Sequence, residues 1–77
     1  MKIVMYALMK DYFEPELHVD EPVLNIDELK QLLLQRNAGV ENVLGVCRFA
    51  VNDWFIDNTF QLQSNDVVSI IPPSSGG

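Results

Sequence analysis

The sequence predicts an α+β domain in which a mixed β-sheet carries one main helix packed across one face. Its two most apolar segments, residues 2–9 and 67–71, lie near opposite ends of the chain, and both require central, covered positions in a sheet. A single amphipathic helical pattern lies between them, at residues 26–37. With 77 residues, the chain has room for one such core and not for two.

The first two expected strands form a hairpin. Residues 2–9 are β-branched and aromatic with a single charge, which predicts a strand covered on much of both faces. Asp11, Glu14 and Pro15 end this segment, and residues 16–20 then alternate polar and apolar side chains, as a half-buried strand does. The short gap favours an antiparallel return onto the first strand, and Pro22 closes the unit.

The helix over residues 26–37 has a clear start signal. The side-chain oxygen of Asn25 can accept a free backbone N–H, and Glu28 can reach back toward the cap. Gly39 can supply the left-handed turn that ends a helix. An apolar stripe follows the cap: Ile26, Leu29, Leu32 and Leu33. We expect the stripe to pack on strand residues, namely Ile3, Val19, Phe49 and Val68 or Ile70.

The C-terminal half predicts three more strands. Residues 46–51 and 54–56 are expected to pair through a tight turn at Asn52-Asp53, because Asn tolerates positive φ. Polar turn clusters on both sides of residues 60–62 predict a loop anchored by its side chains. Residues 67–71 form the last strand, which ends where two prolines cannot donate to a ladder.

These elements fit one topology, the ubiquitin-like β-grasp. Its mixed sheet has the two terminal strands side by side and parallel at the centre, which satisfies their need for burial. One main helix packs across one face of that sheet. The opposite face is then left uncovered and is available to a partner.

Composition narrows the classes of partner. Eleven acidic residues against five basic ones give a net charge of −6, so no nucleic acid is expected and a basic protein surface is favoured. The apolar segments are far shorter than the roughly 20 residues that cross a bilayer, so no membrane partner is expected. Cys47 is the only cysteine and no secretory leader precedes the domain, which together favour a cytoplasmic location.

The usual catalytic patterns are missing from the sequence. The four glycines form neither a phosphate-binding loop nor a dinucleotide fingerprint. A solvated surface residue is favoured over a base for His18, and a small core residue over a reactive thiol for Cys47. Asp53 and Asp57 belong to turns and have no third partner for a metal. We therefore expect no metal, no bound cofactor and no catalytic side chain in this chain.

The most informative segment is residues 72–77, an expected extended and flexible tail after a β-grasp domain at residues 1–71. Pro72-Pro73 is stiff, Ser74-Ser75 is small, and Gly76-Gly77 lacks side chains and ends on a free carboxylate. Six residues at about 3.3 Å each span roughly 20 Å, enough to enter the active site of another protein. The other interpretation is a frayed end without a role, which the stiff spacer after a central strand makes weaker.

Three stretches of the C-terminal half carry a family resemblance: Ala50-Val51-Asn52, Asn65-Asp66-x-Val68, and Ile70-Ile71-Pro72-Pro73-Ser74-Ser75-Gly76-Gly77. They resemble the small subunit of molybdopterin synthase, a sulfur-carrier family with the ubiquitin-like fold. The match is close from Val46 to Gly77 and is one of pattern and length before that. The sequence departs from the family at Asp53, where Gly is common, at the Ser64-Asn65-Asp66 turn, where Asp-Gly-Asp is common, and at Ser74, where a small apolar residue is usual.

The resemblance implies a chemical role for the tail. Gly77 would be adenylated by a ubiquitin-activating-like adenylyltransferase that uses ATP, and sulfur would then displace AMP to leave a thiocarboxylate. The other tail residues would thread this group into the large subunit of molybdopterin synthase, in a heterotetramer: Pro72, Pro73, Ser74, Ser75 and Gly76. There the sulfur would pass to cyclic pyranopterin monophosphate, in molybdenum cofactor biosynthesis. Tyr6, Phe55 and Ile71 on the uncovered face are expected to contact the large subunit, by strand alternation and by their positions in the family.

Other functions use the same features. A sulfur carrier for thiamine or tRNA thiolation has the same terminus, and a ubiquitin-like modifier would attach Gly77 to lysines. A non-covalent β-grasp interaction module would not need the two glycines at all. The double proline favours the molybdopterin pathway, because the thiamine carriers usually lack it.

Overall fold

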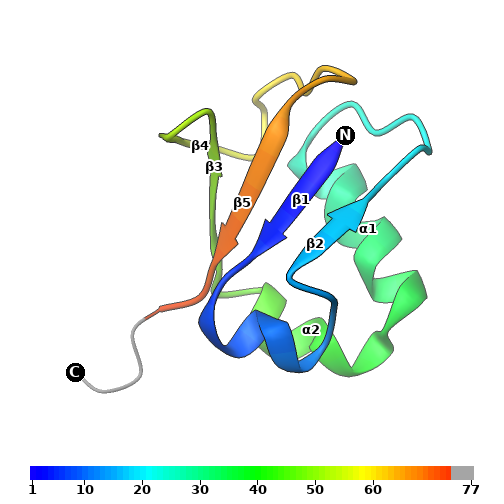
Figure 1. Ribbon diagram of the computed structural model, residues 1–77, viewed down its shortest axis with the longest axis vertical. Coiled ribbons are helices and arrows are strands. Elements are labelled where there is room, and N and C mark those ends of the chain that lie inside the picture. The colour runs from blue at the N-terminus through cyan, green and yellow to red at the C-terminus, as the bar shows by residue number, and fades with distance from the viewer. Residues whose placement is uncertain (74–77) are drawn as a thin grey trace.

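The computed structural model describes residues 1–73, which build a five-stranded mixed sheet with a helix across one face (Figure 1). The strands are β1 (Lys2–Met5), β2 (Glu16–His18), β3 (Arg48–Val51), β4 (Trp54–Ile56) and β5 (Val67–Ile71). The helices are α1 (Ile26–Arg36), the short α2 (Glu41–Leu44) and two 3-10 turns, η1 (Ala7–Asp11) and η2 (Ala38–Val40). The predicted β-grasp arrangement is confirmed.

The two terminal strands meet in the middle of the sheet. The strand order is β2-β1-β5-β3-β4, and β1 runs parallel to β5 with Ile3 beside Val68 and Met5 beside Ile70. These four side chains are at most 1% exposed, which satisfies the burial that their apolar sequence requires. β2 returns antiparallel onto β1, as the short gap between the two segments predicts. On the other side of β5, β3 pairs antiparallel with both β5 and β4.

Helix α1 begins where its capping residue predicts. The backbone N–H of Glu28 donates to Oδ1 of Asn25 at 2.9 Å. Oε1 of Glu28 accepts from the N–H of Leu24 at 3.0 Å, so the carboxylate reaches the residue before the cap. Both bonds satisfy backbone N–H groups that would otherwise lack a partner at the helix start.

The other end of α1 differs from the prediction. The helix ends at Arg36, and Asn37 follows in extended backbone with φ of −154°. Oδ1 of Asn37 accepts from the N–H of Gly39 at 3.0 Å, and its Nδ2 donates to the carbonyl of Tyr12 at 3.2 Å. Gly39 lies in η2 outside the left-handed region, so the prediction that it stops the helix is wrong. Here an asparagine side chain makes the turn and also ties it to a distant segment.

The predicted apolar stripe of α1 faces the sheet. Ile26, Leu29 and Leu33 are fully buried, whereas Leu32 is only partly buried at the edge of the stripe. They join one core with all of the predicted strand partners: Ile3, Val19, Phe49, Val68 and Ile70. The helical period in the sequence therefore identified the packed face correctly.

The first predicted strand is too long. β1 ends at Met5, and the backbone then turns at Ala7, which has a positive φ of 50°, into η1. The prediction of a strand over residues 2–9 is therefore wrong after Met5. The turn buries Met9 completely in the core. This part of the apolar run is therefore buried in a 3-10 turn and does not lengthen the strand.

Other boundaries also move. The strand expected over residues 16–20 ends at His18, and the one expected over residues 46–51 begins at Arg48. The preceding segment forms η2 and α2, which the sequence did not predict and which bury Val40 and Leu44. In the loop before β5, Leu62 is buried and its N–H donates to the carbonyl of Leu24 at 2.8 Å, whereas Phe60 stays exposed. Only one of the apolar side chains in that loop is thus an anchor.

The β3–β4 hairpin turns at Asn52 and Asp53, as predicted, with φ angles of 51° and 72°. Positive φ at both positions is the type I′ turn, whose second position favours glycine because a Cβ is crowded there. We expect Asp53→Gly to raise the free energy of unfolding by about 0.5 kcal/mol, which corresponds to roughly 2 to 4 °C in melting temperature. Thermal unfolding followed by circular dichroism measures this, with Asp53→Ala as the control that should melt lower. An unchanged or lower melting temperature for Asp53→Gly would contradict it.

Candidate functional site

The side of the sheet away from α1 carries the expected partner surface. By strand alternation, Phe55 in β4 and Ile71 in β5 lie on the face of the sheet that points away from the buried core. Phe55 is 55% exposed and Ile71 is half-buried. Tyr6 follows β1, is 45% exposed, and donates its backbone N–H to the carbonyl of Ile70 at 3.3 Å. The three residues predicted as an interface are thus accessible, and Tyr6 continues the β1–β5 pairing to the level of Ile71.

Arg48 is a neighbour of both Ile71 and Phe55 on this face of the sheet. In the β3–β5 register Arg48 lies opposite Ile71, and its guanidinium carbon is 3.8 Å from the centroid of the Phe55 ring. Such a distance is a close cation–π contact. We call Tyr6, Arg48, Phe55 and Ile71 together the sheet patch. Arg48 was not among the predicted site residues, although a lone charge inside an apolar strand was a signal that it points outward.

The root of the tail adjoins this patch. β5 ends at Ile71, Pro72 is buried and Pro73 is exposed. The expected tail at residues 72–77 is therefore held to the domain at its first residue, and about 17 Å of extended chain can follow from Pro73 onward. Ser74, Ser75, Gly76 and Gly77 lie outside the described residues. Ile71 thus joins the patch directly to the segment that is expected to carry the chemistry.

The two isolated candidates from the sequence lie outside the sheet patch. His18 is exposed at the end of β2, as expected. Cys47 is half-buried and its thiol donates to the carbonyl of Val43 at 3.2 Å. Burial raises the pKa of the Cys47 thiol, so less of it is thiolate at neutral pH than for an exposed cysteine. The geometry favours the structural role for Cys47 over that of a reactive thiol.

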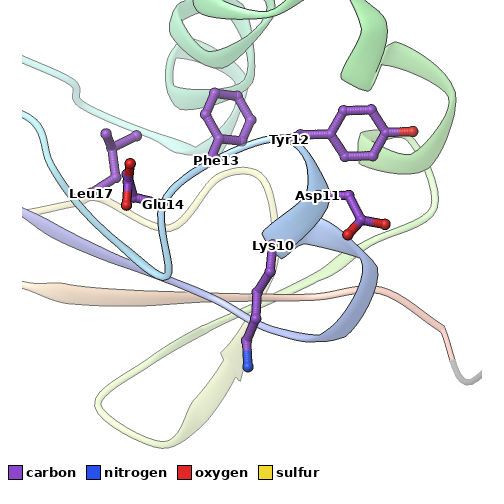
Figure 2. A pocket seen from close by; sticks show the side chains of 6 residues that line it. All are labelled: Lys10, Asp11, Tyr12, Phe13, Glu14 and Leu17. Carbon is purple, nitrogen blue, oxygen red and sulfur yellow. The ribbon is translucent and has the colours of Figure 1, made fainter.

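A hollow beside η1 is lined by Lys10, Asp11, Tyr12, Phe13, Glu14 and Leu17 (Figure 2). Figure 2 shows that the charged ends of Lys10, Asp11 and Glu14 point in different directions. They do not converge on one point, as the polar groups of a substrate site do.

Within residues 1–73, no three His, Cys, Asp or Glu side chains gather as metal ligands would. The part of the chain that the structure describes also has no helix with the length and apolar character of a membrane span.

Comparison with known proteins places this geometry in a family. The model of the ThiS family matches residues 4–77. A chain in the complex of subunits 1 and 2 of the molybdopterin-converting factor from Helicobacter pylori is 30% identical, with a TM-score of 0.71 over 99% of this chain and 96% of that one. SAMP1 from Haloferax volcanii is 16% identical, with a TM-score of 0.82 over 99% and 97% of the two chains, which is a likeness of fold.

The predicted fold and the predicted family are both supported by these matches. The fold agrees over nearly the whole length of two β-grasp structures, and the family match includes both the sheet patch and the tail. The C-terminal resemblance noted in the sequence therefore extends to the N-terminal half, where only pattern and length had suggested it. The chain belongs to the ThiS family of ubiquitin-like sulfur carriers.

Proposed function

We propose that this chain is the sulfur-carrier small subunit of a molybdopterin synthase, with Gly77 as the residue that carries the sulfur. The observation that supports this most is the 30% identity to a chain of the molybdopterin-converting factor complex, over 99% of this chain. The Pro72-Pro73-Ser74-Ser75-Gly76-Gly77 end lies inside the family match. The double proline favours the molybdopterin pathway over the thiamine carriers.

The proposed chemistry begins with activation of Gly77. A carboxylate is a poor electrophile, so a ubiquitin-activating-like adenylyltransferase joins it to AMP from ATP and releases pyrophosphate. A sulfur nucleophile then attacks the carbonyl carbon, the C–O bond to AMP breaks, and a thiocarboxylate remains. The thiocarboxylate sulfur next forms a C–S bond to a carbon of cyclic pyranopterin monophosphate in the large subunit, while a bond from that carbon to oxygen breaks, which links Gly77 to the pterin as a thioester. Water then cleaves the bond between the acyl carbon and sulfur, so the sulfur stays on the pterin. After hydrolysis, the carboxylate of Gly77 is regenerated.

In this proposal the chain contributes position and not catalysis. The side chains that move protons belong to the partners. The sheet patch holds the domain against the large subunit, and buried Pro72 fixes the point from which the tail departs. A fixed departure point reduces the conformational entropy that must be lost when the tail enters a channel.

Mass spectrometry tests the proposal. The purified chain is incubated with the adenylyltransferase of the same organism, ATP and a sulfur donor, and its mass should rise by about 16 Da as one oxygen is exchanged for sulfur. Adding the large subunit and the pterin substrate should return the mass to its starting value. An unchanged mass would contradict the carrier function and favour the interaction module. Sulfur that passes only to a thiamine or tRNA thiolation enzyme would identify one of the other carrier pathways.

The contribution of the sheet patch can be measured separately. Phe55→Ala should weaken binding to the large subunit about tenfold or more, because an exposed aromatic ring in an interface is a frequent energetic anchor. Its melting temperature should stay within about 3 °C of the original chain, since the ring is 55% exposed. Trp54→Ala is the matched control, because Trp54 directly precedes Phe55 in β4, is 77% exposed and lies on the other face of the strand by alternation. Equal affinities for the two variants in calorimetry would remove Phe55 from the interface.

A further inference from the structure

The basic residues of the described chain differ in what they contact. Lys2 pairs with Glu16 at 3.3 Å, and Arg36 makes two hydrogen bonds to the Glu21 carboxylate at 2.8 and 3.0 Å. Within residues 1–73, Arg48 has no acidic side chain in salt-bridge contact and instead lies over an aromatic ring. Its charge is therefore available to a group outside the domain.

The acidic residue that follows β4 is held by its own turn and makes no salt bridge with this guanidinium. Asp57 follows β4 directly, but its Oδ1 accepts from the N–H of Thr59 at 2.9 Å and from the Thr59 hydroxyl at 2.6 Å. These bonds hold the pKa of Asp57 below its usual value and keep the carboxylate in its own turn. Among the residues that the structure describes, no acidic side chain is thus paired with Arg48, which lies over the Phe55 ring.

The contact with Phe55 prepares Arg48 to bind a carboxylate. A flat guanidinium stacked on a ring keeps its N–H donors at its edges, where a carboxylate can accept two of them side by side. The ring also restricts the long side chain before binding, so less conformational entropy is lost when the ion pair forms. Because Arg48 lies opposite Ile71, this donor group is next to the last strand residue before the tail.

We propose that Arg48, stacked on Phe55, binds a carboxylate on the large-subunit surface that receives the tail, and so sets the orientation in which the two proteins dock. This inference rests on the proposed function. The net charge of −6 attracts a basic partner in many orientations. Arg48 lies at the root of the tail and has no acidic partner within residues 1–73, so it is complementary to an acidic group and selects the orientation that brings the tail to its channel. The expected partner surface is basic around one exposed Asp or Glu.

The experiment is a calorimetric titration of the full-length chain with the large subunit of the same organism. Arg48→Ala should raise Kd at least tenfold, and added salt should weaken the original complex more than the variant complex. Arg48→Lys should recover only part of the affinity, because an ammonium group cannot donate the two parallel hydrogen bonds that a guanidinium gives to one carboxylate. Lys10→Ala is the control with the same change of charge, since Lys10 is an exposed lysine of η1, and its Kd should change less than twofold.

A double-mutant cycle separates docking from a purely structural role. Phe55→Leu keeps an apolar side chain but removes the aromatic ring, so the loss caused by Arg48→Ala should be smaller in that background. Circular dichroism checks the fold, and Arg48→Gln replaces the alanine variant if the latter melts early. Equal Kd values for Arg48→Ala and Lys10→Ala would overturn the inference and leave the proposed function intact, because the original chain still binds. A defect confined to the adenylyltransferase would also overturn it. No binding by the original chain would contradict the proposed function itself.

Discussion

Adding one residue after Gly77 is expected to abolish formation of the thiocarboxylate. The extension moves the terminal carboxylate by about 3.5 Å and puts an amide where the acid must meet ATP. Gly77 then has an amide that cannot be joined to AMP, and the carboxylate of the added residue is displaced from the place where the acid meets ATP, so the loss should be complete and not partial. The measurement is the mass of the chain after incubation with the adenylyltransferase, ATP and a sulfur donor. The extended chain should show no gain, whereas the original gains about 16 Da.

A substitution within the tail provides the comparison for this loss. Gly76→Ala leaves the terminal carboxylate in place but adds a methyl group that must pass a narrow channel and restricts positive φ. Its activation should be slowed and not abolished. Both variants should have the same melting temperature as the original chain, because the changed residues lie after the last strand. Full thiocarboxylate and molybdopterin formation by the extended chain would show that Gly77 is not the acyl position.

Leu33→Ala is expected to remove a large part of the free energy of unfolding of this domain. Leu33 is fully buried on the α1 stripe, and removing its branched side chain leaves a cavity between helix and sheet. Such substitutions cost about 2 to 5 kcal/mol. A chain of 77 residues is expected to have only about 4 to 12 kcal/mol of stability in total. Urea unfolding followed by circular dichroism measures the difference.

The control for this cavity is on the same helix. Gln31→Ala changes an exposed side chain of α1 and replaces it with a better helix former, so the urea midpoint should stay the same or rise slightly. The urea midpoint of Leu32→Ala should lie between those of Leu33→Ala and Gln31→Ala, since Leu32 is only partly buried. A melting temperature for Leu33→Ala within a couple of degrees of the original would show that this side chain does not carry the packing assigned to it.

How far sequence patterns predict this fold depends on whether a signal is local. The Asn25 cap, the buried positions of α1 and the turn at Asn52-Asp53 each follow from a few neighbouring residues, and each is confirmed. The end of β1 is different, because an apolar run satisfies a strand and a buried 3-10 turn equally well. Complete burial of Met9 beneath the sheet required the turn at Ala7, a choice that depends on distant residues.

The features of the candidate site also divide into those that the sequence determines and those that depend on the tertiary structure. The sequence by itself determined the fold class and the family, because alternation, helical period and the small residues after two prolines are local properties. Only the tertiary structure decided that Arg48 lies over Phe55 beside Ile71, and that Pro72 is buried at the tail's root. The physical reason is that these contacts join separate strands through their register. A shift of one residue would turn each of these side chains to the other face of the sheet.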